Sequence, residues 1–415
     1  MGDSKNILYG WKIWGWSVCL ILILIVITSV LTGLWVLTAI PIGFLFGFFL
    51  EKADLCGASA FSEVLLMKDW RKIWGIWVVI AVSMIVFFIL SAIGLIKLNP
   101  KPLLWASYVV GGLLFGTGIV FAGGCVSGCL FKTGQGNINS MAGLIGIPLG
   151  VAAVEYGPLH GFSNYLQQFI IRNSNGGSVT IASVTGLPFG LLAIIFGILT
   201  LIVVWSFKRR SSSNIPNKRD NNMTSMQRWL TRPWRPWQAG IAIGILAGLA
   251  YMSSAASGRN YPLGVTHGVL QTELLVTDSQ LKYTYKPSPP SHTTAPKNAN
   301  PSKNVSLWLV FEVAALVFGS LFSAKLSGKI RFIPRPPDET VVAFFGGILL
   351  GAGAAIAGGC VIGNIMSGLA LMSVGMIIFT ATVLLANWIT TYFYLMGGTP
   401  FDIKGYVQSY LKLHN

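Results

Sequence analysis

Charged residues are scarce in this chain of 415 residues, where Asp, Glu, Lys and Arg together make up 10%. Hydrophobic residues make up 53%, and the mean hydropathy is +0.67. So few charges exclude an ordinary soluble domain, about a quarter of which is charged. Cysteine is also rare, and most of the five cysteines lie within apolar segments, which excludes a secreted disulfide framework. The composition predicts an all-α polytopic membrane protein.

Acidic residues are the scarcer charge, with 13 Asp and Glu against 29 Lys and Arg and a net charge of +16. The basic residues lie in the connections between apolar runs, so we attribute the charge to membrane orientation and expect no nucleic-acid partner. Residues 208–235 hold eight basic residues against the single acid Asp220. This loop is therefore predicted to lie in the cytoplasm.

Long uncharged runs are present instead, at 102–131 and 340–401. A helix needs about 20 apolar residues to cross a bilayer, so each run holds at least one membrane span. The same reasoning predicts spans or membrane helices over 13–34, 36–50, 73–96, 104–123, 140–155, 186–207, 237–255, 307–325, 340–358 and 375–396. A short amphipathic helix is expected over 58–67.

A glycine-rich stretch occurs twice. Residues 111–129 read GGLLFGTGIVFAGGCVSGC, and residues 346–364 read GGILLGAGAAIAGGCVIGN. At an offset of 235, 11 of the first 18 positions are identical. A weaker pair, GFLFG at 43–47 and GILAG at 244–248, places Cys56-Gly57 opposite Ser257-Gly258. The chain is predicted to contain two pseudo-symmetric repeats.

Each copy carries a Gly-Gly-Cys interruption inside an apolar run, at Gly123-Gly124-Cys125 and Gly358-Gly359-Cys360. An interrupted helix leaves backbone groups without partners at membrane depth, which is tolerated only inside protein or beside a polar cavity. Paired broken helices are typical of a transport site between repeats. The alternative is that these small residues only let helices pack closely. We expect broken or re-entrant half-helices at both copies.

The repeats divide the chain into four parts. Residues 1–35 form an extra N-terminal span, 36–207 the first membrane repeat, 208–236 the basic cytoplasmic linker, and 237–415 the second repeat. The second repeat includes a loop at 279–304, rich in Pro, Ser, Thr, Asn and Lys. Such a composition predicts disorder. We place this loop outside the cell.

Cysteine at the start of a half-helix suits an anion site, because free backbone N–H groups and the helix dipole favour negative charge there. Cys129 follows Cys125 by one turn, so the two could form a redox or metal pair. The second copy has Asn364 at that place, which favours packing or mild pore lining for Cys129. The histidines show no ligand spacing, so no metal or cofactor is expected. His267 is a candidate for lining a cavity, and Glu312 is placed near the outer end of its span.

Five stretches of the chain resemble one known family. They are LEKADLCGASAF at 50–61, GIVFAGGCVSG at 118–128, SGRNYPLGVTHG at 257–268, FGSLFSAK at 318–325 and AAIAGGCVIGN at 354–364. In them the chain is similar to the YeeE/YedE family of sulfur-compound transporters, and within it to the YeeE-type thiosulfate transporters. The resemblance covers residues 36–396. It implies an hourglass-like pore in which half-helices reach a narrow waist from both sides.

The resemblance also implies the site residues. The three working cysteines of the family carry over onto Cys56, Cys125 and Cys360. We expect the neighbouring polar and small residues to line the same path: Gly57, Gly123, Gly124, Gly258, Gly358, Gly359 and Asn364. Many members of the family work beside a small cytoplasmic sulfur-carrier protein, which makes such a protein a candidate partner.

The leading hypothesis is a transporter that imports thiosulfate, or a closely related sulfur oxyanion, across the bacterial inner membrane. It is not expected to be an enzyme. One alternative is a membrane thiol oxidoreductase that uses Cys125 with Cys129 or Cys56. Others are a channel for a neutral solute and a carrier for another sulfur or selenium species.

Overall fold

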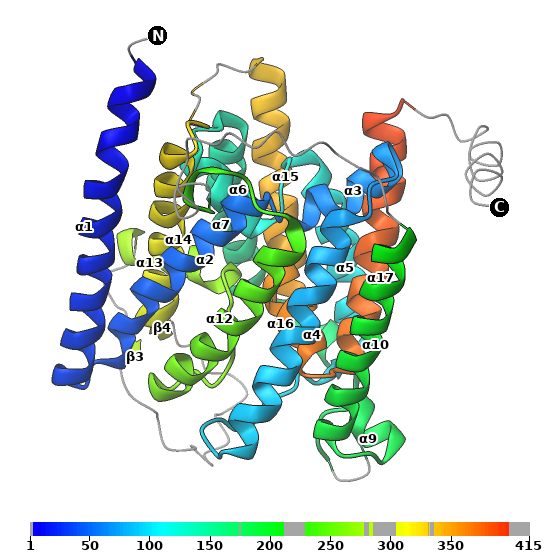
Figure 1. Cartoon of the computed structure of the whole chain (residues 1–415). Helices are drawn as coiled ribbons and strands as arrows, with labels where there is room; N and C mark the ends of the chain where they lie inside the picture. The colour runs from blue at the N-terminus through cyan, green and yellow to red at the C-terminus, as the bar shows by residue number, and fades with distance from the viewer. Residues whose placement is uncertain are drawn as a thin grey trace.

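The helices of this computed structural model lie side by side in one bundle (Figure 1), which confirms the all-α polytopic class. The structure describes residues 3–173, 176–210, 229–277, 282–284, 304–330, 332 and 336–397. Most of the 279–304 loop and residues 211–228 of the linker lie outside these ranges. The predictions of disorder for the loop and of a cytoplasmic position for the linker therefore stay predictions.

The first part of the chain forms α1 (Asp3–Thr32), η1 (Trp35–Thr38), α2 (Ala39–Ala53), α3 (Gly57–Met67), α4 (Arg71–Ala92), α5 (Trp105–Phe121), α6 (Val126–Gly134), α7 (Ile138–Glu155), α8 (His160–Gln167), α9 (Ile181–Thr185) and α10 (Phe189–Arg210). The second part forms α12 (Pro236–Ala256), α13 (Thr266–Thr277), α14 (Leu307–Leu326), α15 (Pro337–Ile356), η2 (Val361–Met366), α16 (Ser367–Ala370), α17 (Val374–Thr390) and η3 (Thr391–Leu395).

Two short sheets, which the sequence did not predict, join connections at the rim of the bundle. β1 (Leu103–Leu104) pairs with β2 (Ile170–Ile171) in antiparallel orientation. β3 (Lys282–Thr284) pairs with β4 (Asn304–Ser306) in parallel orientation. The second pair ties together the two ends of the 279–304 loop.

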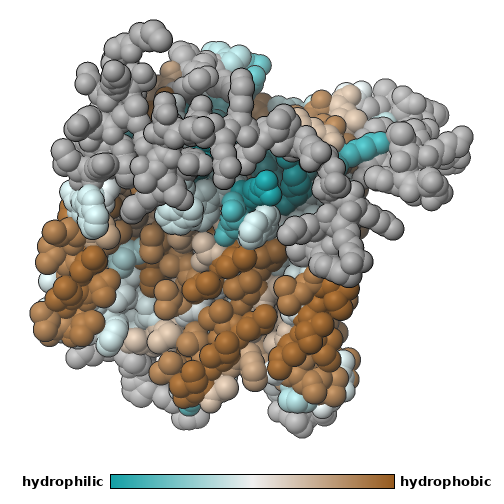
Figure 2. Space-filling view, in the orientation of Figure 1, coloured by the Kyte–Doolittle hydropathy of each residue, from teal (hydrophilic) through white to brown (hydrophobic). Residues whose placement is uncertain are grey.

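The bundle has two ends, which we name by the connections they carry. At the linker end α10 finishes, α12 and α15 begin, and α17 finishes (upper in Figure 1). At the loop end lie β3, β4 and α9 (lower in Figure 1). Figure 2 shows hydrophobic residues over the middle and lower part of one face, with hydrophilic residues gathered toward the linker end.

Nine segments within the described ranges are long and apolar enough to cross a membrane. Three of the nine, Trp35–Met67, Trp105–Gly134 and Pro337–Ala370, are each made of two or more helical pieces joined at a break. The breaks expected at Gly-Gly-Cys are present in the second and third of these segments. The first is broken between α2 and α3, next to Cys56.

The candidate span Gly15–Thr32 agrees with the predicted first span over 13–34 and lies within a helix, α1, that begins at Asp3. α2 covers 39–53 where 36–50 was predicted, because a 3₁₀ turn, η1, precedes it. The helix α13 was not predicted at all. α1 stands at the edge of the bundle (Figure 1), and its apolar side chains, such as Leu20 and Leu31, are exposed. The division of the chain into an extra N-terminal span and two repeats stays a prediction.

Glycine lets the central helices approach each other closely. A Cβ atom at Gly43 or Gly47 of α2 would overlap the backbone of α14 at Glu312 or Leu316. Between α5 and α15, a Cβ at Gly118 would lie 2.5 Å from the Leu350 nitrogen. Close helix packing, the alternative role considered for the glycines, therefore applies to the glycines inside the helices.

The contacts between α5 and α15 also give their relative direction. A Cβ at Gly111, near the start of α5, would lie 2.7 Å from the nitrogen of Ala357, past the end of α15. A Cβ at Gly346, in the first half of α15, would lie 2.5 Å from the nitrogen of Ala122, past the end of α5. The helices are antiparallel, so the break after α5 lies toward the linker end and the break after α15 toward the loop end, with α6 and α16 beyond them (Figure 1).

We predict that Gly47→Ala destabilises the protein, since the new methyl group would overlap the Leu316 carbonyl. Overpacking of this kind costs about 1–3 kcal/mol. Gly15→Ala in α1 is the control: its Cβ meets nothing within 4 Å, and alanine favours a helix over glycine by up to about 1 kcal/mol. The unfolding temperature in detergent should fall for the first variant and hold or rise for the second. Equal melting of both variants would contradict the packing role.

Candidate functional site

Each of the three broken spans has a cysteine immediately before the helical piece that follows its break. Cys56 precedes α3, Cys125 precedes α6, and Cys360 precedes η2 and α16. The cysteine carbonyls accept the first helical hydrogen bonds, from the N–H groups of Ala60, Cys129 and Asn364. Within these described segments no cysteine side chain caps its own helix. The thiols therefore form no capping hydrogen bond with the helices that they precede.

The structure brings two of the predicted cysteines into direct contact. The Sγ atoms of Cys56 and Cys125 lie 3.7 Å apart, and both residues are fully buried. Gly128 makes this contact possible, because a Cβ there would overlap the Cys56 sulfur. The two sulfurs form no disulfide.

Cys360 lies in the neighbouring segment. The residue after it, Val361, packs against Gly57, where an added Cβ would lie 2.7 Å from a Val361 methyl group. Gly57 follows Cys56 directly, so the segments that carry Cys56 and Cys360 touch. The three predicted cysteines thus belong to one buried cluster of helix ends.

The two Gly-Gly-Cys breaks share an unusual backbone. Gly123 and Gly358 both have φ 66°, and Gly359 has φ 157°. Residues with a side chain rarely adopt positive φ, so glycine is needed at the first position of each break, Gly123 and Gly358, and also at Gly359. These glycines therefore have a different task from those inside α5 and α15, since they turn the chain and do not serve helix packing.

A side chain one turn after each break satisfies the carbonyls that the break exposes. The Nδ2 of Asn364 donates to the carbonyls of Ala357, at 3.1 Å, and Gly359, at 3.0 Å. The thiol of Cys129 approaches the corresponding carbonyls of Ala122, at 3.9 Å, and Gly124, at 3.7 Å. Cys129 and Asn364 are related by the offset of 235. The Cys129 sulfur therefore points at backbone oxygens, a geometry that favours packing over a redox pair with Cys125.

A lysine ammonium satisfies the middle carbonyl at each break. Lys132 donates to the Gly123 carbonyl at 2.7 Å. Lys101 donates to the Gly358 carbonyl at 2.5 Å and to the Asn364 Oδ1 at 2.6 Å. The sequence did not predict either lysine as a site residue. The only signal was their place at the edges of the uncharged run 102–131.

A cavity of about 330 Å³ opens at the loop-end break. Cys360, Gly358 and Gly359 line one side of it, and Lys101 and Arg259 supply positive charge. Arg259 is held by the Pro262 carbonyl at 2.7 Å, and its guanidinium lies over the rings of Tyr261 and Trp308 at 5.7 and 5.5 Å. The remaining lining residues are Tyr261, Gly264, Val265, Thr266, His267, Gln271, Ser306, Leu309 and Gly363.

His267 lines this cavity, as the sequence suggested it could. Its Nε2 lies 3.0 Å from Glu155 of α7, so the two side chains join α13 to the first half of the chain. The predicted path residue Gly258 is not among the cavity residues. It ends α12 with φ 95°, and the residue that reaches the cavity from this turn is Arg259.

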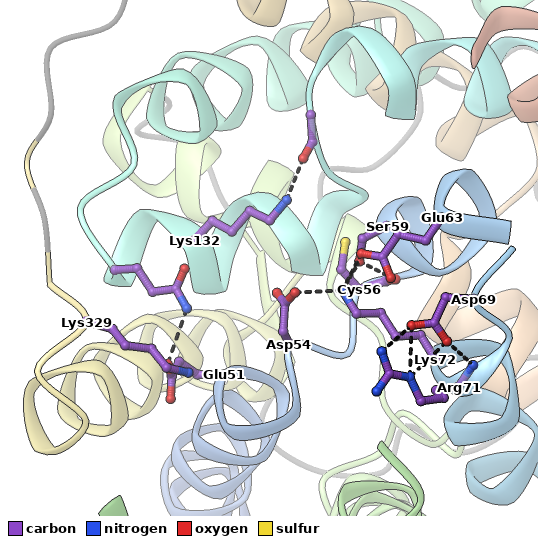
Figure 3. A network of polar contacts seen from close by, with 12 residues as sticks. Glu51, Asp54, Cys56, Ser59, Glu63, Asp69, Arg71, Lys72, Lys132 and Lys329 are labelled. Atoms are coloured by element: carbon purple, nitrogen blue, oxygen red, sulfur yellow. Dashed lines mark hydrogen bonds and ion pairs between the residues drawn. The ribbon is translucent and has the colours of Figure 1, made fainter. Parts of the chain in front are cut away.

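Charged side chains form a network around the break between α2 and α3 (Figure 3). The Lys72 ammonium bonds Asp54 at 2.7 Å, Glu63 at 2.6 Å and Ser59 at 3.2 Å, which ties the start of α4 to both sides of Cys56. Buried Glu51 accepts hydrogen bonds from Lys329 at 3.0 Å and Ser323 at 2.5 Å. These ion pairs fix the α2 to α3 break, so the position of Cys56 depends on them.

Asp69 and Arg71 form a separate pair at the edge of this network, 2.6 Å apart (Figure 3). The hydrogen bond from Arg71 lowers the pKa of Asp69, and Arg71 itself is largely exposed. Exposed pairs contribute little to stability. We assign this pair no part in the site.

Glu312 lies in the first part of α14, at the end of the span that follows the 279–304 loop, where the sequence placed it. The residue is fully buried where α14 crosses α2, which was not expected. The sequence gives the depth of a residue along a helix but not the face that the residue occupies. No group of three metal-binding side chains occurs in the described residues.

Residues 52–389 match the family model described as sulphur transport. The chain belongs to the sulphur transport family. This confirms the resemblance drawn from the motifs. Membership in a transport family supports a transporter and not an enzyme.

Similar proteins match along most of the chain. It is 29% identical over 370 residues to the thiosulfate transporter TsuA of Spirochaeta thermophila, covering 87% of this chain and 96% of that protein. It is 26% identical over 358 residues to the thiosulfate transporter TsuA of Escherichia coli, covering 85% of this chain and 94% of that protein. The probable transporter YedE of Escherichia coli is 30% identical over 175 residues, 40% of this chain and 41% of that protein.

We predict that Asn364→Leu lowers the unfolding temperature in detergent, because it leaves the carbonyls of Ala357 and Gly359 without their donor. Each unsatisfied buried polar group costs about 1–3 kcal/mol. Cys129→Asn is the matched change at the other break and should keep or raise stability, since an amide is a better donor than a thiol. Destabilisation by Cys129→Asn as large as that of Asn364→Leu would show that the two positions are not equivalent.

Proposed function

We propose that this protein imports thiosulfate, or a closely related sulfur oxyanion, through a narrow path lined by Cys56, Cys125 and Cys360. The observation that carries the proposal is the position of these residues: all three lie at the starts of helical pieces, within one buried cluster. Gly123, Gly124, Gly358 and Gly359 shape the two breaks, and Gly57 and Asn364 support them.

The chemistry of such a cluster suits thiosulfate. Helix N-termini present free N–H groups and a partial positive charge, which fit the oxygens of an anion. A thiol is a weak donor, and its soft sulfur matches the terminal sulfur of thiosulfate better than a hydroxyl would. Sulfate offers only oxygens. We therefore expect the thiols to favour thiosulfate over sulfate.

The proposed orientation assigns each mouth of the path to one side of the membrane. With the linker end in the cytoplasm, as the basic residues of 208–235 suggest, the cavity at Cys360 faces the outside of a bacterial inner membrane. An anion would enter past Lys101 and Arg259, reach Cys360, and then meet the Cys56 and Cys125 sulfurs on its way inward. A small cytoplasmic sulfur-carrier protein that accepts it there is part of this proposal.

The proposed architecture is a pair of inverted repeats, 36–207 and 237–415, joined by the linker 208–236. Antiparallel α5 and α15, the shared φ angles at the breaks, and the matching roles of Cys129 and Asn364 support it. Half-helices that reach the cluster from opposite ends would give an hourglass-like pore.

One observation favours a second candidate, a thiol oxidoreductase: the 3.7 Å contact between the Cys56 and Cys125 sulfurs. A dithiol enzyme needs such a pair. The third cysteine, Cys360, and the cationic cavity in front of it have no task in that mechanism. A channel for a neutral solute would have no use for the cations at the breaks.

We predict that Cys125→Ala and Cys360→Ala each abolish or strongly reduce uptake of radiolabelled thiosulfate by cells that lack other importers. Each removes one thiol from the path while adding no bulk. Serine at either position should retain at most part of the activity, because a hydroxyl matches a soft sulfur poorly. Membrane expression of each variant is measured beside uptake.

The control is Cys129→Asn, which copies the second break and should transport at nearly the wild-type rate. An oxidoreductase using Cys129 would lose its activity instead, since an amide cannot replace a sulfur in exchange chemistry. Normal uptake by well-expressed Cys125→Ala or Cys360→Ala would remove the cysteine path.

A further inference from the structure

Two glutamates are fully buried in the described part of the chain, and they differ in their partners. Glu51, near the end of α2, accepts hydrogen bonds from Ser323 and Lys329. Glu312, in the first part of α14, has no hydrogen-bond partner at either carboxylate oxygen. Glu51 therefore ties elements of the bundle together, whereas Glu312 holds no neighbouring side chain in place.

Glu312 lies close behind the wall of the loop-end cavity. It is the sixth residue of α14, about 7.5 Å from the start of the helix at 1.5 Å per residue. Leu309, three residues earlier and therefore on the same face of α14, lines the cavity. Arg259 and Gly264 also line it, and the Arg259 guanidinium and the Gly264 N–H lie within electrostatic reach of the carboxyl group. The carboxyl group is therefore near the loop-end mouth.

These surroundings favour a bound proton. An ionised carboxylate inside a membrane protein is costly when no donor bonds it, and charges at such places are usually paired. Arg259 is the nearby cation, but no hydrogen bond joins it to Glu312. Its guanidinium donates to the Pro262 carbonyl at 2.7 Å instead. A proton neutralises the carboxylate without any rearrangement of these side chains.

Proton binding at Glu312 changes the charge that an entering anion meets. When Glu312 is ionised, its negative charge offsets the positive charge of Arg259. When Glu312 is protonated, Arg259 acts with its full charge. The proton and the anion thus favour each other's binding, and this coupling is reciprocal. A membrane potential that is negative inside opposes import of a dianion, and each proton that travels with the anion removes part of this opposition.

We propose that Glu312 is a proton-binding site, and that the proton it takes up at the loop end is imported together with the sulfur oxyanion. The inference rests on the proposed function, which it deepens by naming the ion that drives uptake. It gives a task to a buried carboxyl group that the path of thiols leaves unused.

A pH gradient tests this proposal. In proteoliposomes with the loop end outside and the membrane potential held at zero, a gradient of one pH unit, alkaline inside, is imposed. For one coupled proton the wild type should accumulate radiolabelled thiosulfate about tenfold. Glu312→Gln keeps the size of the side chain but binds no proton, so its uptake should stop at equal concentrations on the two sides. Glu312→Asp keeps a carboxyl group and should restore part of the accumulation.

Glu51→Gln is the matched control, since it changes the other fully buried carboxylate. It should lower the unfolding temperature in detergent, because it removes the charge that pairs with Lys329, and it should keep the response to the gradient. Glu312→Gln should do the opposite: the unfolding temperature should hold or rise, and the response should be lost. A merely structural role of Glu312 would not separate the two measurements in this way.

Other titratable or charged groups lie on the elements around α14, and two of them serve as further controls. His267 and Glu273 of α13 lie nearer the loop end, and burial raises the pKa of Glu273. His267→Gln and Glu273→Gln should each keep the response to the gradient. The remaining groups, which stay unchanged in all variants but Glu51→Gln, are Tyr251 of α12, Arg259 and Tyr261 of the connection between α12 and α13, Glu51 and Lys52 of α2, and Cys129 and Lys132 of α6.

The proposal is overturned if wild-type uptake ignores the gradient, or if well-folded Glu312→Gln responds to it as the wild type does. Failure of the proposed function looks different, because wild-type vesicles would then take up no thiosulfate even down its own concentration gradient. Infrared spectroscopy of the purified protein still tests the proton site in that case. The carbonyl band of a neutral carboxylic acid should weaken in Glu312→Gln and not in Glu51→Gln, and an unchanged band in Glu312→Gln would contradict the proposal.

Discussion

A membrane helix that breaks inside the protein leaves carbonyl oxygens without helical partners, and the site of this molecule depends on how those oxygens are satisfied. Each Gly-Gly-Cys break exposes three of them. The middle one receives a lysine ammonium, and the two flanking ones receive the side chain at position 129 or 364. An unsatisfied group at membrane depth costs several kcal/mol, so these contacts are a condition for having a break at all.

The same arrangement leaves other groups free for an anion. With the carbonyls occupied by Asn364, Cys129 and the lysines, the cysteines at the helix starts need not serve the backbone. Gly128 in α6 leaves room for the Cys56 sulfur, so that the sulfurs of Cys56 and Cys125 lie 3.7 Å apart, while the glycines within α2, α5 and α15 let these helices pack closely against their neighbours. In the proposed function, structure and transport thus share one set of residues, in which the neutral caps hold the break and the cations and thiols would face the path.

The spans and the two Gly-Gly-Cys breaks could be predicted from the sequence because their signals are local: apolar runs, glycines and a repeated motif. The motifs also identified the family. Contacts between distant segments could not be predicted, as with Lys101, whose partner Gly358 lies 257 positions away. Helix α13 was missed because Pro262 and Gly264 made its surroundings resemble a loop. The burial of Glu312 was not predicted because a hydropathy pattern does not show which face of a helix meets a neighbour.

The most direct test of the central claim asks whether the substrate touches Cys360. In proteoliposomes carrying Cys19→Ala, a small anionic methanethiosulfonate reagent applied at the loop end should modify Cys360 and block uptake, with the site identified by mass spectrometry. Thiosulfate should slow this modification in a saturable way, while sulfate at the same concentration should protect much less. Modification of Cys360 at the same rate with and without saturating thiosulfate would contradict a path in which the anion passes this thiol.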